Sequence, residues 1–214
     1  MLVSLEGNIG CGKSTLLEAL RTTTFNKPHI IVQEDVKGWV SFTDSDNKSI
    51  LEYFYEDKKS FSFCFQTLVL ISRIHHLIQA IKNHPDHIII TERSHLTDFK
   101  IFVETLLENK EITEIEYLTY TKCHSLLNEL MSIKVDAIIY NYTSPQVCIE
   151  RIKRRNRKGE SAIPDSYIKQ LHEKHNDWLI LQPNILVIDG NVDEKNIEQR
   201  LAQIQKIVTY INDL

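Results

Sequence analysis

Glycine is scarce in this chain and unevenly placed. Only six of the 214 residues are glycine, and Gly7, Gly10 and Gly12 account for half of them. Such clustering indicates that the backbone there must adopt conformations, or approach a partner, in a way that side chains would obstruct.

Paired cysteines, long apolar runs and a strong net charge are also lacking. The four cysteines (Cys11, Cys64, Cys123 and Cys148) are far apart and form no CxxC pair, which favours reduced thiols over a disulfide framework. No apolar run approaches the ~20 residues of a membrane-spanning helix. A net charge of −4 does not indicate a nucleic-acid-binding surface. We therefore expect a cytoplasmic protein with no leader segment, no membrane contact and no nucleic acid polymer as partner.

Five short β-branched runs alternate with amphipathic stretches. The runs cover residues 2–5, 29–33, 87–91, 135–140 and 184–188, and helical spacing of apolar residues covers 61–82, 99–107, 115–131 and 197–211. This alternation predicts an α/β fold in one domain spanning residues 1–214, with a five-stranded parallel sheet and helices on both faces. Residues 40–48 are polar and are expected to form a surface loop.

A phosphate-binding loop follows the first run. The sequence Gly7-Asn8-Ile9-Gly10-Cys11-Gly12-Lys13-Ser14, followed by Thr15, fits G-x-x-x-x-G-K-[ST] between a strand and a helix. Backbone N–H groups would surround the phosphates of ATP, Lys13 would neutralise their charge, and Ser14 would bind Mg²⁺. At ordinary residue usage, a chance match arises in roughly one chain of this length in a hundred. GTPases, ATPases, nucleotide kinases and small-molecule kinases share the loop, so it does not identify the reaction.

Charged residues end the second and third runs. Glu34 would lie where a phosphate acceptor enters and can accept a hydroxyl proton, although a solvated strand-end acid is an alternative interpretation. Glu92 can hold Mg²⁺ through water and Arg93 can bind phosphate, whereas a purely structural Glu92–Arg93 ion pair is the alternative.

The helix predicted over 61–82 carries a mixed polar and apolar stripe. Gln66 and Arg73 are seven residues apart and project from nearly the same face as Val69, and Asp98 comes from the next helix. An amide, a guanidinium and a carboxylate around an apolar slot can read a nucleobase edge, with Phe65 stacked on its face. A solvent-facing glutamine and arginine are the alternative.

Six basic residues fall within eight positions: Arg151, Lys153, Arg154, Arg155, Arg157 and Lys158. Arg151 and Arg155 share a helical face, and Gly159 interrupts the segment. We expect an arginine-rich lid at about residues 151–163 that closes on the transferring phosphate, with an RNA-binding patch or a localisation signal as the alternative.

Taken together, these residues resemble the deoxynucleoside kinase family, which contains deoxycytidine, deoxyguanosine and mitochondrial thymidine kinases. The similar stretches cover most of the chain in the family's order: LEGNIGCGKST (5–15), E-x-V-x-x-W (34–39), FSFCFQT (61–67) with SRI (72–74), ERS (92–94) with Asp98, ERIKRRNRKGESAIP (150–164) and LHEKHNDWL (171–179). The resemblance implies a P-loop kinase fold, a homodimer formed through the long helix that includes Phe61, and transfer of the γ-phosphoryl group of ATP to a deoxynucleoside.

The resemblance also implies residue roles. Glu34 is the expected general base on the nucleoside 5′-hydroxyl, and Arg93 is expected to hold that hydroxyl and the phosphates. The remaining implied contacts are Gln66 with the base, Tyr55 and Glu160 with the sugar 3′-hydroxyl, Trp39 and Phe65 around the substrate, and Arg151, Arg155 and Arg157 in the lid.

Arg73 and Asp98 together resemble the deoxycytidine and deoxyguanosine kinase branch. An ionised Asp98 accepts hydrogen bonds from the amino group of cytosine or adenine but would face a carbonyl of thymine, so we expect thymidine to be disfavoured. Val69 is bulkier than the cytidine branch leads us to expect, which leaves cytosine and purines undecided. A thymidine-accepting or broad-specificity kinase stays open as an alternative.

The sequence departs from the family at two positions. Asp35 stands where proline is usual, and its charge is expected to raise the pKa of Glu34; His95 stands where an apolar residue is common. Two further hypotheses remain: a nucleoside monophosphate kinase, disfavoured by a carboxylate on the acceptor side, and a non-catalytic nucleotide-binding subunit, disfavoured by the full set Lys13, Ser14, Glu34, Glu92 and Arg93.

Overall fold

Five parallel strands form the centre of the molecule. The computed structural model describes residues 1–157, 160–193 and 195–214. Its sheet has the order β2-β3-β1-β4-β5, and all four strand pairings are parallel. The strands are β1 (Leu2–Glu6), β2 (His29–Val32), β3 (Ile88–Glu92), β4 (Ala137–Tyr142) and β5 (Ile185–Asp189). The predicted parallel sheet is confirmed, and each strand lies within two residues of its predicted bounds.

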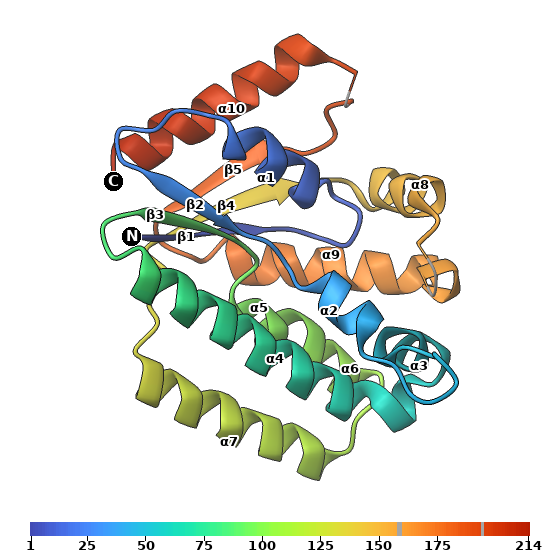
Figure 1. Cartoon of the computed structure of the whole chain (residues 1–214). Coiled ribbons are helices and arrows are strands. Elements are labelled where there is room, and N and C mark those ends of the chain that lie inside the picture. The colour runs from blue at the N-terminus through green and yellow to red at the C-terminus, as the bar shows by residue number, and fades with distance from the viewer. Residues whose placement is uncertain (158–159, 194) are drawn as a thin grey trace.

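Helices cover both faces of this sheet (Figure 1). They are α1 (Lys13–Arg21), α2 (Val36–Ser41), α3 (Ile50–Glu56), α4 (Lys58–Asn83), α5 (His95–Thr97), the π-helix η1 (Asp98–Val103), α6 (Glu104–Glu108), α7 (Glu114–Met131), α8 (Pro145–Arg155), the 3₁₀-helix η2 (Glu160–Ala162), α9 (Asp165–Leu179) and α10 (Ile197–Asn212). In Figure 1, α1 and α10 lie above the sheet, α4 and α9 lie below it, and α7 forms an outer layer against α4.

The side-chain alternation of β1 divides the core between the two faces. Val3 and Leu5 pack with Leu17 and Ile207 on the side of α1 and α10. Leu2 packs with Leu77 of α4 on the other side. Because successive side chains of a strand point to opposite faces, Glu6 also projects toward the side of α4 and α5, where it ends the strand as a buried carboxylate.

The expected loop at residues 40–48 is wrong at its start, because α2 extends through Ser41. Asp35 caps this helix by accepting a hydrogen bond from Gly38 N at 3.1 Å, and the buried Trp39 anchors its inner face. Only the segment after Phe42 is irregular, and a single bridge between Thr43 and Ser49 closes it. The helix was missed because one turn with one buried aromatic gives too short a periodic signal.

The expectation that no segment is long and apolar enough to span a membrane also needs correction. α4 is 26 residues long and is apolar enough, by length and composition, to cross a membrane. Its apolar stretch is 44% buried within the protein, where α4 packs against β2, β3 and α7. A core helix packed on two sides meets the same criterion, because both of those sides are apolar.

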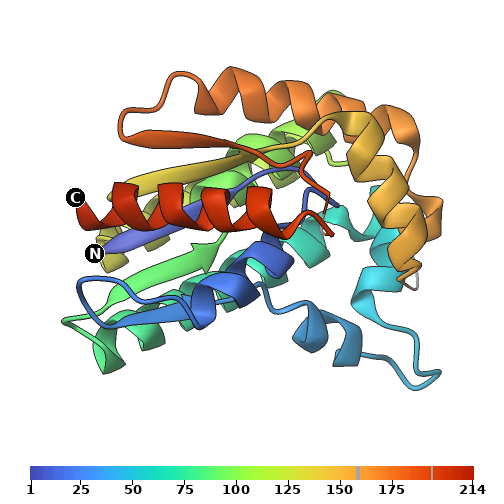
Figure 2. The same cartoon turned by 90° about the horizontal axis from the view of Figure 1, so that it is seen from above.

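The carboxyl ends of the strands converge at one end of the molecule, on the right in Figure 1, opposite the two termini. There α2 and α3 approach α8 and the start of α9, an arrangement that Figure 2 shows from above. In the predicted lid, Arg151 and Arg155 belong to α8, and η2 begins at Glu160. Lys158 and Gly159 lie outside the described residues.

Candidate active site

A cavity of about 470 Å³ opens at the carboxyl ends of the strands. It is continuous from the phosphate-binding loop to α4. Its lining includes most of the predicted site: Ile9, Gly10, Cys11, Gly12, Lys13, Ser14, Thr15, Glu34, Trp39, Tyr55, Phe65, Gln66, Val69, Glu92, Arg93, Asp98, Arg151, Arg155, Arg157 and Glu160. One cavity therefore contains both the predicted donor side and the predicted acceptor side.

The loop between β1 and α1 takes the conformation that its glycines allow. Gly10 and Gly12 have φ angles of 77° and 96°, in the left-handed region that favours glycine. A Cβ atom on Gly10 would lie 2.6 Å from the carbonyl oxygen of Cys148, so the loop also packs closely on α8. Lys13 donates hydrogen bonds to the carbonyl oxygens of Gly7 and Asn8 at 3.0 and 2.9 Å. Those bonds hold its ammonium group inside the curve of the loop.

Ser14 and Glu92 meet at the cavity wall. The Ser14 hydroxyl donates to both carboxylate oxygens of Glu92, at 3.1 and 3.2 Å. A hydroxyl and a carboxylate oxygen beside a phosphate-binding loop are ligands that suit Mg²⁺, which is usually held by one or two protein oxygens together with phosphates and waters. The residues present therefore fit this ion.

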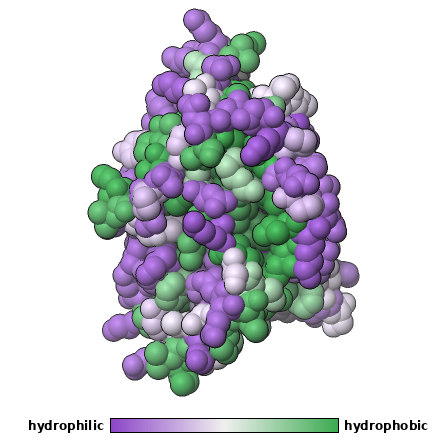
Figure 3. Space-filling model, turned by 90° about the vertical axis from the view of Figure 1, so that its left-hand side faces the viewer, coloured by the Kyte–Doolittle hydropathy of each residue, from purple (hydrophilic) through white to green (hydrophobic). Residues whose placement is uncertain are grey.

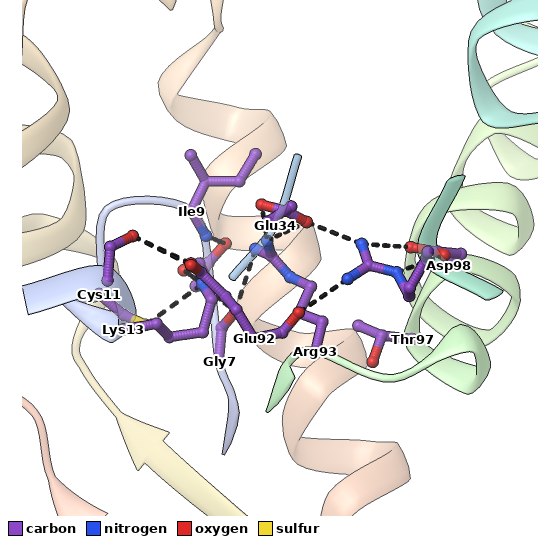
Figure 4. Close-up of polar contacts among 12 residues, drawn as sticks. Gly7, Ile9, Cys11, Lys13, Glu34, Glu92, Arg93, Thr97 and Asp98 are labelled. Carbon is purple, nitrogen blue, oxygen red and sulfur yellow. Dashed lines mark hydrogen bonds and ion pairs between the residues drawn. The ribbon is translucent and has the colours of Figure 1, made fainter. Parts of the chain in front are cut away.

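Glu34 lies between two arginines (Figure 4). Its carboxylate accepts from Arg93 Nη1 at 3.0 and 2.9 Å and from Arg73 Nη2 at 2.8 Å. Only 14% of its side chain is exposed, which excludes the solvated strand-end acid as the interpretation. Burial alone would raise the pKa of Glu34, but the charges of Arg93, Arg73 and Lys13 lower it to about 2.

This value corrects the expectation that Asp35 raises the pKa of Glu34. The Asp35 carboxylate turns toward the N-terminus of α2, where it caps the helix. The nearby arginines and Lys13 then dominate the electrostatics of Glu34. Glu34 is therefore ionised throughout the physiological pH range.

Arg93 combines a strained backbone with a directed side chain. Its φ angle is 62°, unusual for a residue other than glycine, and the side chain is buried. The guanidinium bonds Glu34 and the carbonyl oxygen of Gly7, whereas its Nε has no partner among the described residues. The alternative of a structural ion pair between Glu92 and Arg93 is therefore wrong. Arg93 binds Glu34, and Glu92 accepts from Ser14.

The far end of the cavity is apolar with a few polar groups. Phe65 and Val69 are buried there, and the Oε1 atom of Gln66 is buried without a hydrogen-bond partner in the described structure. Asp98 lines the same end and is fully buried. Gln66 and Asp98 thus provide an unpaired amide oxygen and a carboxylate in an apolar slot, and the solvent-facing alternative does not hold.

Arg73 is buried but does not appear among the described residues that line this cavity. It binds Asp98 through two hydrogen bonds, Nε to Oδ2 at 2.8 Å and Nη2 to Oδ1 at 3.1 Å. Nη1 donates to the carbonyl oxygen of Glu92 at 2.7 Å. Arg73 therefore lies behind the cavity wall and connects Asp98, at the apolar end of the cavity, to Glu34, at the end near the phosphate-binding loop.

The basic segment divides into two parts. Arg155 and Arg157 form ion pairs with Glu160 at 2.7 and 2.9 Å. These three residues line the same cavity as Tyr55. Arg151 instead donates to the carbonyl oxygens of Cys11, Gly190 and Val192 at 3.1, 2.8 and 2.9 Å. Arg151 thus connects the phosphate-binding loop to the segment after β5, a contact that helical spacing did not indicate.

Comparison with known families agrees with this geometry. The family model for deoxynucleoside kinases matches residues 3–214. The chain belongs to the deoxynucleoside kinase family. It is therefore an ATP-dependent phosphotransferase that acts on a deoxynucleoside, on a P-loop kinase fold.

Curated relatives of this kinase span most of its length. Mitochondrial deoxyguanosine kinase of Xenopus laevis is 36% identical over 83% of this chain and 72% of its own length. Deoxycytidine kinase 2 of Gallus gallus is 32% identical over 91% of this chain and 83% of its own. Deoxycytidine kinase of Homo sapiens is 30% identical over 99% of this chain and 91% of its own.

Several cavity residues of this kinase were not predicted from its sequence. Phe102 of η1 lines the cavity with its ring 5.1 Å from the Arg93 guanidinium, and Tyr167 of α9 lines it with a buried hydroxyl that has no described partner. Val192, Arg200 and Gln203 line the end near α10. Phe102 could have been found from its helical spacing to Asp98, since residues four apart share a face. His95 is buried and stacked on His124 at 5.6 Å, outside the cavity lining.

Proposed function

We propose that this kinase phosphorylates the 5′-hydroxyl of deoxycytidine and purine deoxynucleosides in preference to thymidine, as a step of nucleoside salvage. The observation that carries the proposal is the buried chain of charges Asp98–Arg73–Glu34–Arg93, which runs from the base end of the cavity to the transfer end. The names of the relatives, which are deoxyguanosine and deoxycytidine kinases, support the same preference.

At the transfer end, Glu34 would orient the 5′-hydroxyl and accept its proton. A carboxylate with a pKa of about 2 is a weak base, so the proton moves only as the bond to phosphorus forms. That timing suits a loose phosphoryl-transfer transition state, in which positioning and charge stabilisation supply most of the acceleration. Arg93, which lines the cavity, would donate to the hydroxyl or to the transferring phosphate.

On the donor side, the loop from Gly7 to Thr15 would surround the phosphates of ATP, with Lys13 neutralising their charge. Arg151, Arg155 and Arg157 would form the lid over them, with Arg151 at its base, a position that its three carbonyl contacts support. Mg²⁺ held by Ser14 and Glu92 would neutralise charge on the donor phosphates. Tyr55 and Glu160 would hold the sugar 3′-hydroxyl, while Trp39 and Phe65 pack around the nucleoside.

Base preference would follow from hydrogen-bond direction at Asp98 and Gln66. Arg73 donates one hydrogen bond to each carboxylate oxygen of Asp98, so each oxygen can accept a further hydrogen bond from the side of the cavity. An exocyclic amino group satisfies that capacity, whereas the carbonyl group of thymine would leave two buried acceptors facing each other, at a cost of about 1–3 kcal/mol. A measurement of kcat/KM for the four deoxynucleosides tests the proposal. Values for thymidine equal to or above those for deoxycytidine and both purines would refute it.

The preference against thymidine is expected to weaken in acid. Burial raises the pKa of Asp98 to about 6 against the opposing charge of Arg73. As pH falls through 6, the protonated carboxyl group becomes a donor that accommodates a carbonyl. The kcat/KM ratio of deoxycytidine to thymidine should fall at least about fourfold between pH 7.5 and pH 5.5, because the ionised fraction of Asp98 falls by that factor. Asp98→Asn serves as the comparison, and a wild-type ratio as flat as that of this variant would contradict the assignment.

We also propose a homodimer that forms through α4 and α7. These helices pack side by side and expose apolar side chains, including Ile71 on α4 and Ile115, Leu118 and Leu130 on α7. Apolar atoms also reach the lower edge of Figure 3, where α7 lies. Light scattering should give about twice the 25.0 kDa of one chain for wild type and one chain mass for Leu118→Lys. Leu201→Lys, at a position on α10 that is slightly more exposed than Leu118, should stay dimeric. A monomeric wild type would refute the proposal.

We further propose that the protein acts in the cytoplasm, without a membrane or a nucleic acid polymer as partner. All four cysteines are free, as suits a reducing compartment. The apolar surface of α4 is assigned to its packing within the subunit and to the proposed dimer. Cell fractionation that finds the full chain with membranes or in another compartment would contradict this location.

A further inference from the structure

A buried carboxylate outside the cavity lining organises the turn after β3. Glu6, the last residue of β1, is fully buried and accepts hydrogen bonds from four donors. Its Oε1 accepts from the Ser4 hydroxyl and, at 3.0 Å each, from Ser94 N and Ser94 Oγ. Its Oε2 accepts from the Thr97 hydroxyl at 2.7 Å. This set of contacts, Glu6 with Ser4, Ser94 and Thr97, is called the Glu6 network below.

The Glu6 network fixes the backbone on either side of Arg93. The N–H of Arg93 donates to the carbonyl oxygen of Leu5 at 3.0 Å, and its own carbonyl oxygen accepts from the Thr91 hydroxyl at 3.0 Å. The next N–H, that of Ser94, donates to Glu6. Two successive residues of β1 therefore hold the two peptide groups that flank Arg93.

These constraints act on a residue whose φ angle of 62° costs energy. A strained residue of this kind persists only where its surroundings determine its conformation, and relaxing it would redirect the whole side chain. In Figure 4, Arg93 extends from the end of β3 toward Glu34, with Thr97 beside it on the following helical turn. Relaxation would therefore move the guanidinium away from Glu34 and from the carbonyl oxygen of Gly7.

We propose that Glu6 is a positioning residue for phosphoryl transfer, which holds Arg93 in its strained conformation and so directs the guanidinium at the reacting atoms. The inference rests on the role proposed for Arg93. It requires the length of the glutamate side chain more than its charge, because the carboxylate must reach Ser94 N and Thr97 Oγ1 at once.

Two substitutions separate reach from charge. Glu6→Asp keeps the charge but shortens the side chain by one methylene, and should lower kcat about a hundredfold, the usual cost of a displacement near 1 Å. Glu6→Gln keeps the reach, and its kcat should stay within about tenfold of wild type, because the Thr97 hydroxyl can rotate to accept from the new amide. Affinity for Mg²⁺-ATP, measured by calorimetry, should change less than about threefold in both, since the loop contacts of Lys13 are untouched.

A matched control lies at the other end of β1. Asp136 accepts a hydrogen bond from Leu2 N at 2.8 Å, far from the cavity. Asp136→Asn weakens a contact of the same strand and should leave kcat unchanged. Thr97→Val removes a single donor from the Glu6 network and should lower kcat about threefold to tenfold, which keeps the test available where Glu6→Asp does not fold.

A double-mutant cycle with Arg93→Lys shows whether Glu6 acts through Arg93. Glu6→Asp combined with Arg93→Lys should be no slower than Arg93→Lys alone, whereas a general structural effect would multiply the two losses. The role of Glu6 would be overturned, and that of Arg93 left standing, by either of two results. One is a double variant whose loss of kcat is the product of the two single losses. The other is a Glu6→Asp enzyme with wild-type kcat while Arg93→Lys is slow. Full activity of Arg93→Lys would instead overturn the role proposed for Arg93, and that of Glu6 with it.

Discussion

Glu34→Gln is expected to lower kcat by about a thousandfold while the KM values for nucleoside and ATP change little. Glutamine has the same shape but cannot accept the 5′-hydroxyl proton, and it leaves Arg73 and Arg93 facing each other without the carboxylate that both bind. The measurement is steady-state kinetics with deoxycytidine and Mg²⁺-ATP, supported by thermal unfolding to confirm that the variant is folded.

The neighbouring carboxylate provides the control for Glu34. Asp35 caps α2 through Gly38 N, a contact that asparagine also makes, so Asp35→Asn should keep kcat within about twofold of wild type. Equal losses in the two variants would indicate a general electrostatic effect of this segment. A Glu34→Gln enzyme with more than about a tenth of wild-type kcat would remove Glu34 as the base.

Arg73→Met combined with Asp98→Ala is expected to shift the kcat/KM ratio of thymidine to deoxycytidine by about a hundredfold toward thymidine. The pair of substitutions removes the buried acceptor that would face the carbonyl of thymine, together with the cation that holds it in place. Overall kcat should also fall, because Glu34 loses one of its two arginine partners. Competition between the two nucleosides in one reaction measures the ratio directly.

The single variants test the physical reason. Asp98→Ala alone leaves the Arg73 guanidinium buried without the carboxylate that binds it through two hydrogen bonds, so this variant should unfold at a lower temperature than the double variant. A double variant that still rejects thymidine as strongly as wild type would place the selectivity elsewhere, with Val69 and Gln66 as the next residues to test.

The sheet and the phosphate-binding loop were predictable because their signals are local. The run at 87–91 contains three consecutive isoleucines that are buried between two layers, and the motif from Gly7 to Ser14 encodes its own backbone shape. The pairing of charges was not predictable in the same way. Glu92 and Arg93 are adjacent in sequence, yet the turn at Arg93 sends one side chain to Ser14 and the other to Glu34.

Residues distant along the chain were harder to assign. Tyr167 and Gln203 line the cavity only because α9 and α10 return to the carboxyl ends of the strands, and nothing in their local sequence marks them. Arg151 follows the spacing of a lid residue, but its three carbonyl partners come from the loop after β1 and from the segment after β5. Such contacts depend on strand order, which periodicity does not specify.

The most direct test of the proposed reaction is the fate of the γ-phosphoryl group. With γ-labelled ATP, Mg²⁺ and deoxycytidine, the purified protein should form labelled deoxycytidine 5′-monophosphate in equal amount to ADP, and 2′,5′-dideoxycytidine should accept no label. Label released as inorganic phosphate alone, or transferred to the 3′-hydroxyl, would contradict phosphorylation of the 5′-hydroxyl by the site around Glu34.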